Sequence, residues 1–212
     1  MRLWIVPLLL TLSTIPLFGQ WTDQQIKDIV TNSPWAKQVA LNGAPVTVRW
    51  ESAAPVIEAC AQGGMEKYLF SCASKLLYLS GLEKKFTEMA EHFWILSISN
   101  YPKLPVTGIG PPPPDHSAAA NAELARAGKE IQRTTTLTPD SSPPLTPIDV
   151  VVLPAGDALL VLLFFDRAGF SDRAEPLAPE PKDMFFDSIY GEVHIKTRFH
   201  LADMKDKGKP AL

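Results

Sequence analysis

The chain has four histidines, His92, His116, His194 and His200, the side chains that most often bind metals or move protons near neutral pH. His194 and His200 lie in one alternating segment, where Glu192 shares their side. Six residues of extended chain place the two rings roughly 20 Å apart, too far to share a metal ion. We therefore interpret this side as a solvated polar face. Asp115-His116 stands at an expected helix start, where aspartate is common.

Motifs of nucleophilic, metal and phosphate chemistry are missing from the sequence. It has no G-x-S-x-G, no His-Glu-x-x-His and no Walker-type loop. Cys72 stands where a Ser-x-x-Lys motif ending at Lys75 would need serine. Lys196-Thr197-Arg198 resembles the Lys-Thr-Gly strand of penicillin-binding enzymes, but arginine replaces the glycine and the serine partner is missing. We assign no catalytic, cofactor-binding or metal-binding residue and no cofactor, and we expect a non-enzyme.

The two cysteines allow three interpretations. Cys60 and Cys72 would lie about 18 Å apart on one continuous helix, and a hairpin at Gly63-Gly64 would place them at unequal distances from its turn. An oxidising compartment would favour a bond between them. A disulfide, two buried thiols and a catalytic thiol all stay open. We expect the function to need neither cysteine.

Aromatic and proline clusters could bind ligands, but each also has a packing interpretation. We expect five aromatic side chains to pack in the core rather than form a sugar-binding platform: Trp21, Trp35, Trp50, Phe93 and Trp94. The run Pro111–Pro114 favours polyproline II, and we interpret it as a stiff spacer rather than a docking ligand.

Composition narrows the class of protein. The 212 residues are 46 % hydrophobic and 20 % charged, which is typical of a folded globular chain. Lysine and arginine number 20 against 23 aspartates and glutamates, for a net charge of −3. This balance argues against a nucleic-acid partner, because such binders need a basic face.

The first twenty residues have the layout of a secretory signal peptide. Arg2 precedes an apolar run, and a small residue stands just before a cut at Gly19/Gln20. Polar residues and a proline interrupt the run, which favours cleavage over a membrane anchor. We predict a signal peptide over 1–19, one domain over 20–212, a secreted or periplasmic protein, and no stable membrane span after cleavage.

Helix signals concentrate in the first two thirds of the chain. Thr22 and Gln25 form a capping-box pattern, and Asn32-Ser33-Pro34 ends the helix that it opens. A second helix is expected over 53–62 with Ser52 as its cap, further helices over 65–79 and 80–91, and another over 117–133. Proline-rich loops are expected over 101–115, 138–147 and 171–182.

Strand signals complete an α+β pattern. Asn42-Gly43 marks a turn before a strand at 46–50, and a buried strand follows at 92–99. Two apolar runs, 148–153 and 158–165, form a predicted hairpin buried on both faces. A short strand is expected at 184–186, and a strictly alternating one at 191–202. We predict one antiparallel sheet, covered by helices, that holds the strands near Val46, Phe93, Val150, Leu160 and Ile195.

Two short motifs resemble those of a group of uncharacterised secreted bacterial proteins. They are Ser33-Pro34-Trp35-Ala36-Lys37, after a short helix, and Arg49-Trp50-Glu51-Ser52-Ala53-Ala54-Pro55, after a strand. A β region with a basic tail, here 191–209, completes the resemblance. It implies a cell-envelope location and no particular reaction.

The sequence therefore predicts a secreted or periplasmic non-catalytic protein, an envelope interaction or binding module with an unknown envelope protein or ligand as partner. The alternatives are a small-molecule or lipid carrier and an enzyme of unrecognised type. A carrier would have an enclosed apolar pocket. An enzyme would have titratable groups that converge in a cleft, and a binding module would have an exposed apolar patch.

Overall fold

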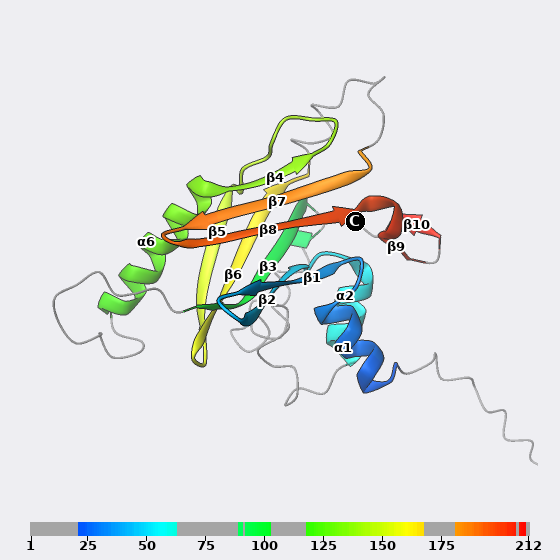
Figure 1. Ribbon diagram of the computed structural model, residues 1–212, viewed down its shortest axis with the longest axis horizontal. Coiled ribbons are helices and arrows are strands. Elements are labelled where there is room, and N and C mark those ends of the chain that lie inside the picture. Colours follow the sequence, from blue (N-terminus) through cyan, green and yellow to red (C-terminus); the bar gives the residue numbers. More distant parts are fainter. Residues whose placement is uncertain are drawn as a thin grey trace, which may run out of the picture.

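The computed structural model describes residues 21–62, 89–90, 92–102, 118–167, 181–206 and 208–210. These residues form an α+β fold with a five-stranded sheet, a three-stranded sheet and a short two-stranded ribbon, all antiparallel (Figure 1). The predicted signal peptide, the run Pro111–Pro114 and the two helices expected over 65–91 lie outside the described residues, except for residues 89–90, which are helical.

The five-stranded sheet has the order β1-β2-β3-β6-β5. Its strands are β1 (Ala36–Leu41), β2 (Ala44–Trp50), β3 (Phe93–Pro102), β6 (Ala158–Asp166) and β5 (Asp149–Ala155). The β1–β2 turn is Asn42-Gly43 with positive φ at both residues, the geometry that suits a two-residue hairpin. The β5–β6 hairpin turns at Gly156-Asp157, and β6 is buried along both faces as predicted.

The three-stranded sheet has the order β4-β7-β8 and corrects the prediction of a single sheet. Its strands are β4 (Thr135–Pro139), β7 (Asp183–Tyr190) and β8 (Val193–His200). The strand near Ile195 therefore belongs to this second sheet. β4 lies partly in the segment expected to be a loop, and β7 is longer than the three residues predicted. In Figure 1 these strands run across β3, β5 and β6 rather than along them.

The core lies between the two sheets. Val48, Ile98, Val161 and Val152 form one row across the larger sheet, and they belong to the same buried cluster as Phe186, Ile195 and Phe199 of the smaller one. The Trp50 ring meets Trp94 and Phe199 edge to face, with centroids 5.9 and 5.7 Å apart. The five aromatic residues expected to pack in the core all belong to or pack against the buried clusters.

Three α-helices of eight or more residues in the described part of the chain border the sheets. α1 (Asp23–Thr31) begins with the predicted capping box of Thr22 and Gln25, and it packs beside α2 (Ala54–Gln62). α2 begins one residue later than predicted, so Ser52 does not occupy the position of its N-cap; the Ser52 Oγ instead accepts a hydrogen bond from the Ile95 amide on β3. α6 (Ala118–Thr134) packs on β5 and β7 and so joins the two sheets. After β8 the chain forms a 3₁₀ turn (Leu201–Asp203) and the ribbon of β9 (Lys205–Asp206) and β10 (Lys209–Pro210).

Candidate functional site

The outer face of the three-stranded sheet carries a ladder of charged pairs. The alternation of β8 turns Ile195 and Phe199 inward, as the sequence predicts, and turns its basic residues outward. The register then places Asp183 opposite His200, Phe185 opposite Arg198, Asp187 opposite Lys196 and Ile189 opposite His194. We call these eight residues the ladder face.

Each aspartate of the ladder face lies between two basic side chains. Asp183 Oδ2 accepts a hydrogen bond from Arg198 Nη2 at 2.6 Å, and His200 Nδ1 lies 2.6 Å from its other oxygen. Asp187 pairs with His194 Nε2 at 2.8 Å and with Lys196 Nζ at 3.1 Å. The face therefore consists of two separate clusters, one centred on each carboxylate.

These contacts lower the pKa of both carboxyl groups. The hydrogen bond from Arg198 lowers the pKa of Asp183 below its ordinary value, and the positive charges around it outweigh the opposing effect of burial. Burial by itself raises the pKa of Asp187, but hydrogen bonds from His194 and Lys196 reverse this and leave a lowered pKa. Both side chains are thus held as carboxylates at neutral pH.

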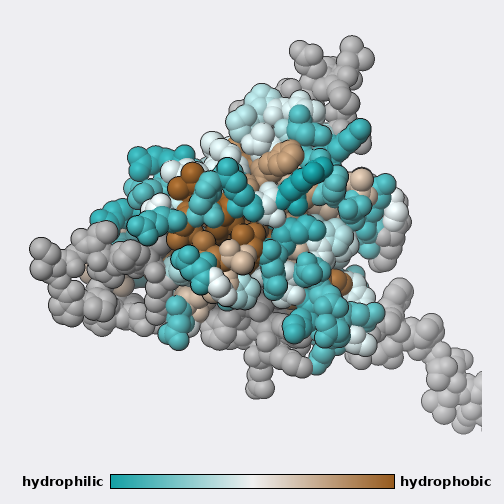
Figure 2. All heavy atoms as spheres, in the orientation of Figure 1, coloured by the Kyte–Doolittle hydropathy of each residue, from teal (hydrophilic) through white to brown (hydrophobic). Residues whose placement is uncertain are grey.

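Two large apolar side chains stand exposed among these charges. Phe185 and Ile189 on β7 are 42 % and 43 % exposed, whereas their neighbours Met184 and Phe186 are buried in the core. The Arg198 guanidinium lies 5.7 Å from the centre of the Phe185 ring, a cation–π distance. Figure 2 looks onto this side of the molecule and shows apolar atoms between hydrophilic side chains.

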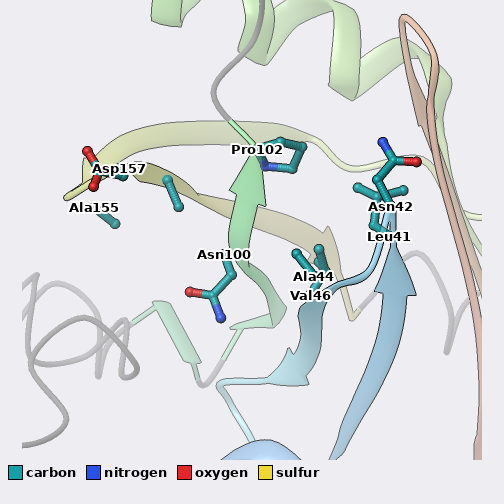
Figure 3. Close-up of a pocket in the computed structure, with 9 residues that line it drawn as sticks. Leu41, Asn42, Ala44, Val46, Asn100, Pro102, Ala155 and Asp157 are labelled. Carbon is teal, nitrogen blue, oxygen red and sulfur yellow. The ribbon is translucent and has the colours of Figure 1, made fainter.

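A pocket of about 490 Å³ lies at the hairpin end of the larger sheet (Figure 3). Leu41, Ala44 and Val46 line it from the β1–β2 hairpin, Asn100 and Pro102 from β3, and Ala155, Asp157 and Ala158 from the β5–β6 hairpin. Figure 3 shows Pro102 across from Ala44 and Val46. Asp157 is the only titratable residue among the described ones that line this pocket.

A bulge in β3 shapes this pocket. The β3–β6 register shifts between Ile98 and Tyr101, and Asn100 adopts a left-handed φ of 58°. Its side-chain amide donates to the Pro45 carbonyl at 3.3 Å, which holds the β3 end beside β2. β3 thereby extends through Pro102, into the segment expected to be a loop.

A further charged cluster, separate from the ladder face, is buried between α1, β2 and β3. Arg49 and Glu51 are each 1 % exposed and form an ion pair. Arg49 also donates to the Val30 carbonyl at the end of α1 at 2.8 Å, and Ser97 donates to the Glu51 carboxylate from β3. The cluster joins α1, β2 and β3, and we interpret it as structural because all of its described partners belong to these neighbouring elements.

Two of the four histidines, His194 and His200, lie on the polar face that the sequence predicts. His194 and His200 pair with different aspartates, as their spacing implies, and Glu192 lies in the turn beside them. Within the described residues, no group of three or more His, Cys, Asp or Glu side chains is placed to hold a metal ion. His92 lies at the start of β3, where its ring contacts Phe93, and His116 is outside the described residues.

The open question of the cysteines is decided for Cys60, which is disulfide-bonded. The one other cysteine of the chain is Cys72, outside the described residues. Sequence reasoning missed Phe185, Ile189, Asp183 and Asp187 as surface groups, because only three residues of β7 were expected to be a strand. Their alternation over 183–190 was the available signal.

Comparisons of the chain with protein-family models, with curated proteins and with solved structures gave no match. Among the helices of the described residues, none is long and apolar enough to cross a membrane.

Proposed function

We propose that this protein is an exported, non-catalytic binding protein of the cell envelope that holds its partner on the ladder face. The observation that carries the proposal is the exposure of Phe185 and Ile189 between charged pairs. Burying large apolar side chains against a partner stabilises a complex, and phenylalanine and arginine are enriched in interfaces. The proposal assigns no reaction to the protein.

Export is supported by two independent features. Residues 1–20 have the charge and apolar pattern of a signal peptide, and the disulfide of Cys60 is typical of an oxidising compartment. Mass spectrometry of the mature protein should therefore find its N-terminus near Gln20. An intact Met1 on protein from the cytoplasm would contradict export.

The binding test is a pull-down from the envelope fraction with two matched variants. Phe185→Ser with Ile189→Ser removes the apolar part of the ladder face without touching the core. Ile148→Ser is the control, because Ile148 is 52 % exposed and lies outside this face. We expect wild type and the control to retain the same envelope component and the ladder-face variant to lose it. Equal retention by all three would refute the proposed surface.

A carrier of a small molecule is the second candidate, favoured by the pocket at the hairpin end. Its volume of about 490 Å³ lies in the range of ligand sites, and most of its lining is apolar. Native mass spectrometry of the purified protein should then show a bound small molecule that Ala158→Trp displaces. A protein that carries none and retains its envelope partner would leave the binding module as the function.

A further inference from the structure

The basic side chains of the ladder face are more exposed to solvent than its two aspartates. The side chains of Lys196, Arg198, His200 and His194 are 64 %, 51 %, 53 % and 44 % exposed, whereas Asp187 is 37 % and Asp183 only 10 % exposed. A partner that approaches along the sheet normal thus meets positive charge first. The face carries equal numbers of aspartates and permanent cations, but its outward charge is basic.

The two aspartates are also paired with neighbours within the sheet. Asp183 is held by Arg198 and His200, and Asp187 by His194 and Lys196. All four of these neighbours belong to β8, in the same sheet as the two aspartates. An external anion can therefore contact the outer sides of the same basic groups without displacing the aspartates.

The apolar side chains lie on the same face of the sheet as the basic side chains. Phe185 and Ile189 are four residues apart on one strand, which separates them by about 13 Å. They project from the broad side of a sheet, next to the exposed row of β8. Amphipathic helices that bind anionic bilayers likewise combine apolar side chains, which enter the headgroup region, with basic side chains that contact the lipid charges.

We propose that the ladder face docks on an anionic lipid bilayer, with Phe185 and Ile189 entering the headgroup region and Lys196 and Arg198 against lipid phosphates. This inference rests on the proposed function and names the partner for its surface. A bilayer is favoured over an acidic protein because the apolar and basic groups share one broad face of a sheet, which can meet an extended surface. The net charge of −3 means that attraction must come from this local patch.

The test is sedimentation of the mature full-length protein with vesicles. The probes are vesicles of equal parts phosphatidylglycerol and phosphatidylcholine, and vesicles of phosphatidylcholine alone. We expect binding to the anionic vesicles at ~0.1 M NaCl and a large decrease at ~0.5 M, because salt screens exposed charges. Absence of binding to anionic vesicles, or equal binding to both kinds, would overturn the proposal.

Four variants locate the binding surface. Lys196→Gln should weaken partitioning about fivefold, the contribution of one basic residue at such a membrane. Lys129→Gln on α6 is its control and should have no effect, since Lys129 is exposed outside the ladder face. Phe185→Ser with Ile189→Ser should weaken binding at least about tenfold, and Ile148→Ser should not. Equal losses in variants and controls would place binding elsewhere and overturn the proposal.

The two proposals fail separately. The pull-down could retain an envelope protein through Phe185 and Ile189 while wild type does not bind anionic vesicles. In that case the lipid inference is wrong and the proposed binding function is supported. If neither assay depends on the ladder face, both proposals are wrong.

Discussion

Arg49 and Glu51 bring two full charges into the interior of the fold. Removing a charge from water is costly, and the cluster offsets this cost through the ion pair, the Val30 carbonyl and the Ser97 hydroxyl. A buried pair of this kind need not make the protein more stable than an apolar pair would. It does make the fold sensitive to the loss of either member.

Glu51→Gln should therefore destabilise the protein strongly. The variant leaves the buried Arg49 guanidinium without its carboxylate, which costs about 3–5 kcal/mol in the free energy of unfolding. Glu123→Gln removes a half-buried carboxylate 3.4 Å from the exposed Arg126 and should cost less than about 1 kcal/mol. Urea unfolding of both variants checks this, and similar midpoints would refute the structural role of the buried pair.

Asp183 should make the protein sensitive to acid. Its pKa is lower in the folded than in the unfolded state, chiefly through Arg198, so it stabilises the fold above its unfolded value of about 3.9. That stabilisation disappears as the pH falls through the lower, folded pKa. Below about pH 5 the Tm of wild type should fall as the pH is lowered, and in Asp183→Asn and Arg198→Gln it should fall less steeply. Wild-type slopes in both variants would contradict this assignment.

At the scale of elements, local signals predicted most strands and helices but not how the sheets divide. The capping box of α1, the Asn42-Gly43 turn and the alternation of β8 each reside in a few neighbouring residues, and all are confirmed. β4 was missed because it is a short threonine-rich strand that ends in proline. Without β4 the sequence offered β7 no second partner beside β8, and a separate three-stranded sheet could not be foreseen.

The candidate site was predictable only in part for the same reason. The basic row of β8 follows from the alternation of that strand, and its exposure to solvent was expected from the sequence. The pairing of that row with Asp183 and Asp187 depends on the β7–β8 register, and the pocket depends on two hairpin turns and the end of β3, which meet in space. Contacts between segments distant in the sequence leave no local pattern.

Gly128 lets α6 approach the larger sheet closely. A Cβ at this position would lie 3.3 Å from the Val150 carbonyl oxygen and 3.6 Å from Val152 Cγ2. Gly128→Val should thus push the helix away and destabilise the protein by about 1–3 kcal/mol. Ala125→Val, on the exposed side of α6, carries only the lower helix propensity of valine, below about 1 kcal/mol. Thermal unfolding compares them, and equal Tm values would disprove the close packing.

The whole molecule combines a disulfide-bonded helix with a sheet face far along the sequence. Cys60 lies on α2, which packs beside α1, whereas the ladder face belongs to the last third of the chain. Stability and binding should therefore respond to different substitutions.

Cys60→Ala should lower stability and leave binding intact. Loss of a disulfide typically costs about 2–4 kcal/mol in the free energy of unfolding. Wild type in reductant should unfold at the same urea concentration as the variant in either condition, and both should retain the envelope partner. An unchanged midpoint in reductant would contradict a stabilising bond, and loss of binding by the folded variant would contradict the separation of the two roles.

The position of β3 has a consequence for the kinetics of folding. β3 pairs with β2 and with β6, and long stretches of sequence separate it from both, whereas β1–β2, β5–β6 and β7–β8 are hairpins closed by two-residue turns. Such hairpins form within about 1–10 μs. Before β3 can pair, the chain must lose conformational entropy to bring together the ends of two long segments, 51–92 before β3 and 103–157 after it. The larger sheet should accordingly assemble in the millisecond-to-second range of proteins rich in non-local pairs, with the docking of β3 as its slow step.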